Sequence, residues 1–493
     1  MIRTVLLVGT TSFWLLMTSL LIQKEYFEAS SIQASYEILP LDLETREEYH
    51  AISLGKERVG FGYSVLDARE QPKGTFELRH QSYMSFRFLG QEREILIRGK
   101  AKVDRQLNLR EFELKISSGE NWTKIVGKTE QKNMLLAIEG SEGSPAHKTI
   151  PMPEPVLYSE AINFIWTPDN LKLGKQGKLR LWNPLMMNFQ EIRFHVQKKE
   201  KLLYAGKEND VLVVAMDMGG IETHAWITPT GIVLKQESPT GLTTQKEESW
   251  QSLQAVRKGQ FKPPDLPNLY SISSNQVLEN PEKMDYLKIK LEQPNQEKIL
   301  EFKKDSLEGL ENISLPVSVP ADLPEMANYL ATDEWVQSAD PVIIQQAREI
   351  AGNEKNAWTA SLKIADWVHQ YILPTPTLSL PRAREVLATK KGDCNEYTIL
   401  FTALARAIGI PTKMNAGLVY QNGRFFYHAW PSIYLNRWIN LDPTFGQAPA
   451  DVTHIPLVEA NLQEQIALVN QLGRIKVFIL STEENKNKTG SSL

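Results

Sequence analysis

Cysteine is almost absent from the chain, because Cys394 is the only one among 493 residues. A lone cysteine cannot form an intramolecular disulfide, so disulfide bridges within the chain do not hold this fold together, and the paired-cysteine spacing of structural zinc sites is missing as well. Neither HExxH nor GxxxxGK[ST] occurs, and none of the eight histidines pairs with another at ligand spacing. The sequence therefore predicts neither a metal nor a cofactor.

An excess of charge of either sign is also missing, since the formal net charge is −4. Nucleic-acid-binding proteins present a strongly basic face or stripe, which this balance does not favour. Nucleic acid is therefore not an expected partner. With 42% hydrophobic and 23% charged residues, the composition is that of a globular protein, and the length favours several domains. The oligomeric state cannot be read from these features.

One long apolar run stands out at the N-terminus, where residues 4–23 carry no charge. This length is just enough for a helix to cross a bilayer. No small-x-small cleavage site follows, so we expect residues 1–26 to be an uncleaved membrane anchor rather than a cleaved signal segment or a buried helix. Arg3 favours a cytoplasmic N-terminus, which would leave the bulk of the chain periplasmic or otherwise extracytoplasmic; secretion after cleavage is the alternative.

Residues 27–260 are predicted to form a large, mainly antiparallel all-β domain. Apolar and polar residues alternate in "TFELRHQSYMSF" and "REFELKI", and glycine-bearing turns separate such segments. No catalytic or metal-binding pattern occurs here, so the role of this domain is not readable. A proline-rich stretch follows, and residues 261–323 are predicted to form a linker and a small β module.

Residues 324–482 are predicted to form an α+β domain, followed by a disordered polar tail at 483–493. Asp340, Pro341 and Gly352 have the positions of a helix cap, first turn and end. A second helix is predicted in "NAWTASLKIADWVHQYI" and a third from Cys394 onward. Strands are expected in "TKMNAGLVY", "RFFYHAWPSIYL" and "RWINLDPTF".

Cys394 is predicted to lie in the first turn of a helix, directly after Gly392 and Asp393. Unpaired N–H groups and the helix dipole lower a thiol pKa there and favour the nucleophilic thiolate. The alternative is an inert buried cysteine that acts as a small hydrophobic residue. The position alone does not decide between the two.

Two later residues favour the reactive interpretation. His428 lies in a predicted strand, and Asp442 ends the next one. Taken singly, His428 fits a hydrogen-bonded core histidine and Asp442 a turn residue. Together with Cys394, they supply a nucleophile, an imidazole that takes its proton and a carboxylate that orients the imidazole.

The motifs "GDCNE", "HAW" and "DPT", in this order, resemble the transglutaminase-like superfamily, which has a papain-like cysteine-enzyme core. The resemblance covers about residues 325–482, and the architecture is similar to bacterial membrane-anchored members with an N-terminal β domain. It implies that Cys394 is the nucleophile, His428 the general base and then acid, and Asp442 the orienting carboxylate. The family commonly carries an acidic residue two positions after the tryptophan of "HAW". This chain has Ser432 at that position, preceded by Pro431, so the local strand geometry and one substrate contact can differ from those of the family.

Further residues near these motifs are candidates for support or for lining the cleft. Asp393 directly precedes the cysteine, and Glu396 matches an acidic position that we interpret as structural support. Trp430 is expected to pack beside His428 rather than to form a substrate platform. Asp451 and His454 follow the triad; they could line the cleft, but we expect solvent-facing loop residues.

The resemblance implies a cysteine-dependent acyl-transfer enzyme that acts on amide bonds of a protein or peptide through a thioester. Water as the acceptor gives a protease or amidase, and an amine gives a cross-linking transglutaminase. We favour hydrolysis, because no sequence feature identifies a path for an amine. A non-catalytic cell-envelope adaptor with a retained core is the alternative from another class. The expected fold class is thus multidomain: a transmembrane helix, an all-β domain, a small β module and an α+β papain-like core.

Overall fold

The structure is a computed structural model of the chain. It describes residues 45–484, apart from the following segments: 72–73, 89–90, 143–144, 153–154, 219–221, 250, 253–260, 262, 294–295, 319–323, 376–381 and 460–473. The predicted anchor at residues 1–26 and most of the predicted tail lie outside the described residues. The last described strand, β25 (Lys476–Glu484), extends into the predicted tail.

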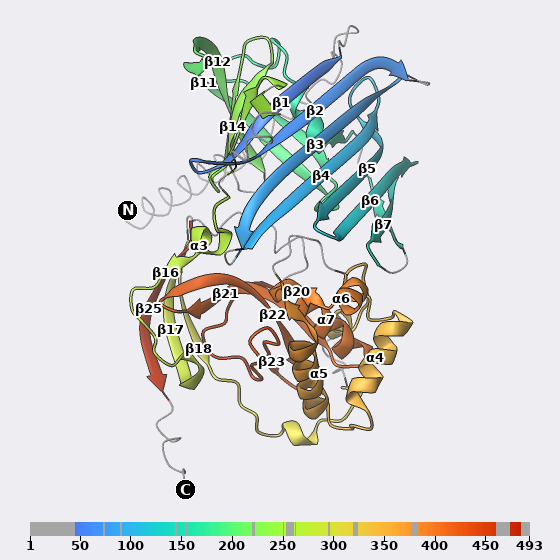
Figure 1. Ribbon diagram of the computed structural model, residues 1–493, viewed down its shortest axis with the longest axis vertical. Helices are drawn as coiled ribbons and strands as arrows, with labels where there is room; N and C mark the ends of the chain where they lie inside the picture. The colour runs from blue at the N-terminus through green and yellow to red at the C-terminus, as the bar shows by residue number, and fades with distance from the viewer. Residues whose placement is uncertain are drawn as a thin grey trace, which may run out of the picture.

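The predicted fold class requires a correction. Within the described residues, no helix is long and apolar enough to cross a membrane. The longest described helix, α5 (Ala357–Tyr371), has 15 residues, fewer than the roughly 20 that a membrane span needs, and it contains Lys363 and Asp366. The apolar run at 4–23 falls outside the described residues. The described chain consists of a large all-β domain and a smaller region that contains the helices (Figure 1).

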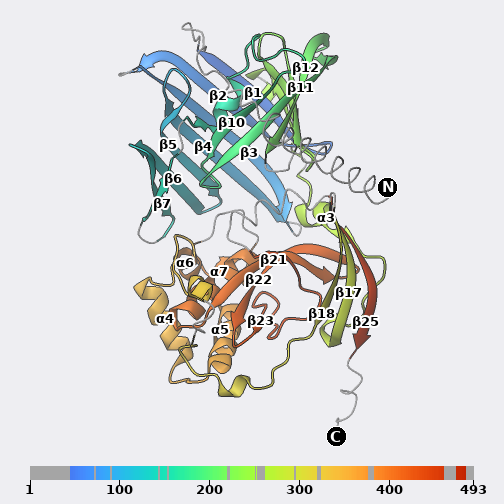
Figure 2. The same ribbon diagram turned by 180° about the vertical axis from the view of Figure 1, so that it is seen from behind.

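The N-terminal domain is one large curved sheet whose strands mostly join their sequence neighbours. Its strands are β1 (Arg46–Leu54), β2 (Glu57–Gln71), β3 (Thr75–Phe88), β4 (Gln91–Val103), β5 (Leu109–Ser118), β6 (Asn121–Glu130), β7 (Asn133–Gly140), β8 (Ala146–Pro151), β9 (Leu157–Tyr158), β10 (Gln176–Asn183), β11 (Asn188–Tyr204), β12 (Lys207–Met218), β13 (Glu222–Ile227), β14 (Val233–Glu237) and β15 (Leu242–Glu247). Their order is β8 to β1 followed by β15 to β9, and β1 pairs antiparallel with β15. Figure 2 shows from behind how the sheet curls over its own inner face.

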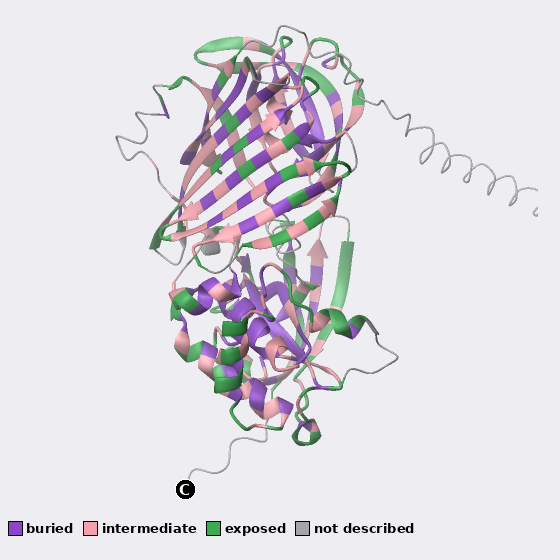
Figure 3. Ribbon diagram, turned by 90° about the vertical axis from the view of Figure 1, so that its right-hand side faces the viewer, coloured by how far each residue is buried: buried purple, intermediate pink, exposed green. Residues whose placement is uncertain are grey.

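Alternating side chains explain how this sheet makes its core. In β5, Phe112, Leu114 and Ile116 are buried, while the residues between them are more exposed. The same alternation marks successive strands in Figure 3. Because neighbouring side chains of a strand point to opposite faces, the sheet presents one apolar face to its interior and one mixed face outward. This is the pattern that "REFELKI" predicts.

The helices lie in the C-terminal part of the chain. They are α4 (Pro341–Ala351), α5, α6 (Ala383–Thr389) and α7 (Cys394–Ala407), preceded by the short α3 (Leu266–Tyr270). Short 3-10 turns occur at Ser159–Asn163, Pro281–Lys283, Leu310–Asn312 and Pro324–Tyr329. The side chain of Asp340 accepts a hydrogen bond from the Val342 N–H and caps α4, and Gly352 ends that helix at a φ of 61°. Helix α7 is the central one, since it contacts α4, α5, α6 and the sheet beside them.

A second sheet lies against α7 and has the order β16-β22-β21-β24, with β23 paired to one end of β22. Its strands are β16 (Ile272–Ser273), β21 (Thr412–Gln421), β22 (Arg424–Tyr434), β23 (Trp438–Asn440) and β24 (Ile455–Glu459). Asn422 and Gly423 form the turn between β21 and β22, and both have positive φ. An Asn-Gly pair at a two-residue turn fixes the register of a hairpin. That register positions His428 in the sheet.

A third sheet joins segments from both sides of the helices. Its order is β18-β17-β25, with β17 at Met284–Gln293 and β18 at Gln296–Lys303. Its apolar side chains share a buried cluster with β21, β22 and β24. Two short parallel strands, β19 (Leu373–Pro374) and β20 (Lys391–Gly392), pair directly before α7. The chain entering the helix is therefore tied to the end of α5.

The all-β domain contacts the helical region through the end that carries β7 and β8. Lys148 of β8 forms an ion pair with Glu334, with 2.6 Å between Nζ and Oε1. The guanidinium of Arg382, a fully buried residue beside α6, donates to the Glu142 carbonyl at 3.4 Å. One continuous apolar cluster contains residues of both parts. The two parts thus bury surface against each other close to the helix that leads into α7.

Candidate active site

The motif "GDCNE" builds the start of α7. Asp393 is the cap residue, and its side chain accepts a hydrogen bond from the Asn395 N–H at 3.1 Å. In turn, Oε2 of Glu396 accepts a hydrogen bond from the Asp393 N–H at 2.9 Å. This reciprocal pair is a capping box, which satisfies N–H groups that otherwise lack a partner at a helix start. It fixes Cys394 as the first residue of the helix.

Gly392 is required by the close approach of Glu396. A Cβ on residue 392 would lie 2.1 Å from the Glu396 Cβ, far inside van der Waals contact. Any larger side chain would displace Glu396 and break the capping box. The prediction that Glu396 is structural support agrees with this geometry.

The Cys394 thiol faces strand β22. The backbone N–H of Ala429, the residue after His428, donates toward its sulfur. The residue remains half-buried and keeps some contact with solvent. Helix α7 packs against strand β22. Cys394 at the start of the helix therefore lies beside the strand that carries His428.

The predicted low pKa of this thiol is wrong in direction. Burial raises the pKa of Cys394 well above its ordinary value, and the carboxylates of Asp393, Glu396 and Asp442 raise it further, while the Ala429 N–H opposes them. The same Asp393 and Glu396 that build the capping box place negative charge next to the sulfur. A buried site with carboxylate neighbours disfavours a thiolate. The resting group at neutral pH is therefore the neutral thiol.

His428 lies in β22 and is almost fully buried. Its Nε2 lies 2.7 Å from Oδ2 of Asp442. The Phe445 ring stacks on the imidazole with 4.7 Å between centroids and 9° between planes, and Trp430 lies parallel at 6.0 Å. These two aromatic rings and the carboxylate fix the plane of the imidazole. Nδ1 is consequently the ring nitrogen available for proton exchange with another group.

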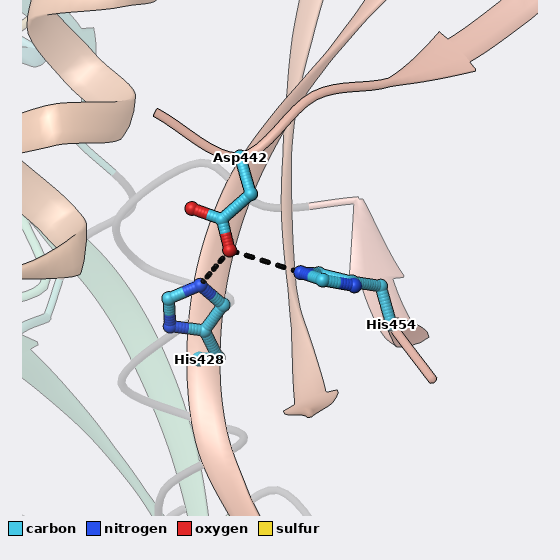
Figure 4. A group of neighbouring side chains, drawn as sticks. All are labelled: His428, Asp442 and His454. Atoms are coloured by element: carbon cyan, nitrogen blue, oxygen red, sulfur yellow. Dashed lines mark hydrogen bonds and ion pairs between the residues drawn. The ribbon is translucent and has the colours of Figure 1, made fainter. Parts of the chain in front are cut away.

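Asp442 follows β23 and is fully buried within a tight turn. Its Oδ1 accepts hydrogen bonds from the backbone N–H groups of Thr444, at 2.8 Å, and Phe445, at 3.2 Å. Its Oδ2 accepts from two imidazoles, those of His428 and His454 (Figure 4). The structure thus brings together His428 and Asp442 as predicted, and adds a second histidine.

The sequence analysis misjudged His454 and Asp451, which it expected to face solvent: His454 is 2% exposed, and the Asp451 side chain is 8% exposed. Its Nε2 lies 2.9 Å from Oδ2 of Asp442. On the other side of the ring, Nδ1 lies 3.1 Å from the Asp451 carbonyl oxygen and 3.3 Å from its Oδ1. The Asp451 carboxylate also accepts from Thr453 N–H, an Asx turn for which "DVT" is a recognisable signal. That signal predicts a fixed turn but not where the histidine points.

The ionised groups of this cluster each face a partner of opposite charge in the protein interior. Burial alone would raise the pKa of Asp442, but attraction to His428 and hydrogen bonds from His428 and His454 hold it well below its usual range. Burial opposes the charged form of His454, yet Asp442 and Asp451 raise its pKa to about 9. Hydrogen bonds from His454 and Thr453 outweigh burial and lower the pKa of Asp451 to about 2. His454 is therefore an imidazolium at neutral pH, held between two carboxylates.

The departure at Pro431 and Ser432 leaves the strand intact. Strand β22 continues through both residues, and the Pro431 carbonyl accepts from the Leu441 N–H at 3.0 Å. The Ser432 hydroxyl donates to Asn440 Oδ1 at 2.6 Å and accepts from Asn415 at the same distance. The serine is thus part of a buried polar network.

Trp430 is fully buried in that network. Its indole N–H donates to Asn440 Oδ1 at 3.2 Å. A side chain with no exposed surface cannot serve as a substrate platform, so Trp430 packs beside His428 and His454.

A metal ion is the other group that this cluster could hold. In the described part of the chain, only His428, Asp442 and His454 offer three ligand atoms within 4.8 Å of one another. Tetrahedral zinc with bonds near 2.1 Å separates its ligand atoms by about 3.4 Å. The two nitrogens here lie 2.7 and 2.9 Å from the carboxylate oxygen, which is hydrogen-bond spacing. The arrangement fits shared protons better than a shared metal.

No curated protein matched the chain. Among solved structures, the chain is similar to a candidate cysteine protease from Cytophaga hutchinsonii, with 20% identity, a TM-score of 0.29 and coverage of 39% of this chain and 66% of that one. It is also similar to a β-barrel-like protein of unknown function from Brucella abortus, with 8% identity, a TM-score of 0.32 and coverage of 42% and 96%. TM-scores this low carry no weight for the fold.

The family comparison is more specific. Residues 344–443 match the family model of the transglutaminase-like superfamily, and this segment includes Cys394, His428 and Asp442. Asp451 and His454 lie beyond its end. The membrane anchor and the N-terminal β domain of the resembling proteins receive no support from these comparisons. The comparisons thus give one specific resemblance, that of residues 344–443 to the transglutaminase-like superfamily.

Proposed function

We propose that this protein cleaves amide bonds of a protein or peptide substrate through a thioester on Cys394, with water as the final acceptor. The observation that carries the proposal is the buried hydrogen bond of 2.7 Å between His428 Nε2 and Asp442 Oδ2, on a strand whose next N–H donates toward the Cys394 sulfur. These contacts support the assignment of Cys394 as nucleophile, His428 as base and Asp442 as orienting carboxylate, the three roles that acyl transfer needs.

The thiol is activated by proton transfer during attack rather than by prior ionisation. Since burial and three carboxylates raise the pKa of Cys394, a standing thiolate is unfavourable. His428 keeps Nε2 on Asp442 and takes the thiol proton through Nδ1. Asp442 stabilises the imidazolium that forms and does not itself accept the proton.

The reaction proceeds in two halves that balance. The Cys394 sulfur attacks the amide carbonyl as its proton passes to His428, and a tetrahedral oxyanion forms. His428 returns the proton to the amine, the C–N bond breaks and a thioester remains. Water then attacks the thioester with His428 as base, so the acid is released and the thiol regains its proton.

The start of α7 supplies stabilisation for the oxyanion. Backbone N–H groups at a helix N-terminus point outward and carry partial positive charge. We assign this role to N–H groups at the helix start, including that of Cys394, which the capping box of Asp393 and Glu396 holds rigidly.

Water is preferred over an amine as acceptor because water needs no binding surface of its own. An amine acceptor, as in a cross-linking transglutaminase, needs room for a lysine side chain beside the thioester. Both outcomes share the first half-reaction, so one assay can contain both acceptors.

The test incubates the full-length protein with a library of quenched fluorescent peptides, in heavy-oxygen water and with a fluorescent primary amine present. Mass spectrometry then reads the products. Hydrolysis places heavy oxygen in a new carboxyl group, whereas transfer attaches the fluorescent amine. We expect the carboxyl product.

Matched variants decide whether peptide turnover depends on Cys394. Cys394→Ala should abolish turnover, while His224→Gln, on β13 in the all-β domain, should leave it unchanged. Turnover that survives in Cys394→Ala would end the proposal. If only the amine product forms, the acceptor is an amine and the protein is a transglutaminase instead of a hydrolase. If peptides bind but no product forms, a non-catalytic adaptor is favoured.

A further inference from the structure

We propose that His454 is a positioning residue that acts through Asp442: it holds Oδ2 of the carboxylate toward His428 and neutralises its charge, and Asp451 orients His454 in turn. This inference rests on the proposed function of Cys394 and His428. It extends the site from three residues to five, and both added residues lie beyond the segment that matches the transglutaminase-like family model.

The geometry gives Asp442 a complete set of partners only with His454 present. Oδ1 is held by two backbone N–H groups of its own turn, those of Thr444 and Phe445. Oδ2 accepts hydrogen bonds from two imidazoles, at 2.7 Å from Nε2 of His428 and 2.9 Å from Nε2 of His454. Because Asp442 is fully buried, bulk water cannot replace a lost partner. His454 therefore fixes the carboxylate oxygen that His428 uses.

The position of His454 is itself fixed from two directions. Strand β24 begins at the next residue and pairs with β21, which anchors the backbone. The Asx turn of Asp451 and Thr453 holds the other side of the ring through Nδ1. The Trp430 ring contacts His454 edge-on at 5.1 Å between centroids. A ring held in this way has little freedom to turn from Asp442.

Charge explains why a second histidine is useful here. His428 must be neutral in the resting state if it is to take the proton of a neutral thiol. The negative charge of a buried carboxylate such as Asp442 favours the protonated form of an imidazole beside it. The His454 imidazolium offsets part of that charge, and its hydrogen bond to Oδ2 keeps the carboxylate oriented toward His428.

The charged and titratable surroundings of His454 come from several elements. Asp442 follows β23, Asp451 belongs to the same turn, and His428 lies in β22 with 5.9 Å between ring centroids. On its far side, Asp442 also acts electrostatically on Cys394 at the start of α7, where the carboxylates of Asp393 and Glu396 lie as well. The net effect on His454 is set by the two aspartates that contact it.

The test compares His454→Gln with His454→Phe in the full-length protein, using the peptide turnover assay. Gln can still donate to Asp442 but carries no charge, whereas Phe keeps the ring volume but loses both properties. For His454→Gln we expect the acid limb of the kcat/KM profile to move to higher pH by about one unit. His454→Phe should lower kcat more strongly, with little change in KM.

Controls separate this inference from the proposed function. Asp451→Asn leaves the contact of His454 with Asp442 in place, so it should move the acid limb less than His454→Gln does, and His224→Gln should not move it. The inference is overturned if His454→Gln keeps the wild-type pH profile while Cys394→Ala is inactive. It is also overturned if both His454 variants lose activity only in proportion to lost folded protein, or if one equivalent of a transition metal copurifies and disappears with His454. Activity that persists in Cys394→Ala instead defeats the proposed function.

Discussion

Glu396 occupies the space that a side chain on Gly392 would need, since a Cβ there would lie 2.1 Å from the Glu396 Cβ. This contact connects the glycine before the cysteine to the capping box that starts α7. The motif "GDCNE" therefore has a structural role as well as a chemical one, because it fixes the start of α7 and so the position of Cys394.

Gly392→Ala should destabilise the protein by about 1–3 kcal/mol, because Glu396 must move and the capping box opens. Urea unfolding followed by tryptophan fluorescence measures the change. The matched control is Gly62→Ala in β2, where a Cβ would meet its nearest neighbours at 3.7 and 3.8 Å, ordinary contact distances. Equal stability of the two variants would show that Glu396 can adjust without cost.

The Cys394 thiol should react slowly with iodoacetamide in the native protein. Burial and the carboxylate of Asp393 raise its pKa, so less thiolate is present at each pH between 6 and 9 than in the urea-unfolded chain. Because this is the only cysteine, the labelling rate reports on Cys394 alone. Faster labelling of the native protein at pH 6 would instead indicate a stabilised thiolate.

Asp393→Asn tests the source of that shift. Asparagine is also a good helix cap, so α7 should keep its start while the largest neighbouring negative charge is removed. We expect the pH profile of labelling to move to lower pH than in the wild type, with the melting temperature little changed. An unchanged profile would mean that the charge of Asp393 does not contribute to the thiol pKa.

Asp442→Asn should lower turnover by roughly 10²- to 10⁴-fold while the fold is retained, since the orienting charge for His428 is lost. The same change removes a partner of His454, so the pKa of His454 should fall from about 9 toward its ordinary value. Selective nitrogen labelling of histidines, read by NMR across pH 6–10, measures that second effect. A small loss of turnover with an unshifted His454 would contradict the role of Asp442.

His454 should make stability depend on pH. Its folded pKa of about 9 lies above the unfolded value near 6.5, so its stabilisation is fully present below pH 6.5 and is lost as pH rises through 9. The contribution is of the order of 3 kcal/mol. The difference in unfolding free energy between wild type and His454→Gln should shrink between pH 6.5 and pH 9. A constant difference would mean that His454 does not hold its proton more tightly in the folded state.

Local features of the fold could be predicted from the sequence. Alternation placed Phe112, Leu114 and Ile116 on the buried face of one strand, because side chains of a strand alternate between faces. Asp340 and Gly352 mark the ends of α4 through capping and positive φ, both properties of single residues. For the same reason "GDCNE" predicted a helix starting at Cys394.

Part of the site was predictable because its spacing is local. His428 lies in β22, and Asp442 lies in the turn that follows β23, the strand paired antiparallel with β22; short connections bring such residues close together. Their hydrogen bond of 2.7 Å follows from that pairing and from the turn in which Asp442 lies.

The pKa of Cys394 and the role of His454 were decided only by the tertiary structure. A helix start alone favours a thiolate, but packing against β22 and the carboxylates of Asp393 and Glu396 reverse the effect, and burial is a property of the whole fold. Sequence places His454 in a loop, and only the pairing of β24 with β21 turns its ring toward Asp442. The sequence determined which chemical groups are available and where helices and strands begin. The tertiary structure determined which charges face one another without water between them, and this fixes the protonation of the site.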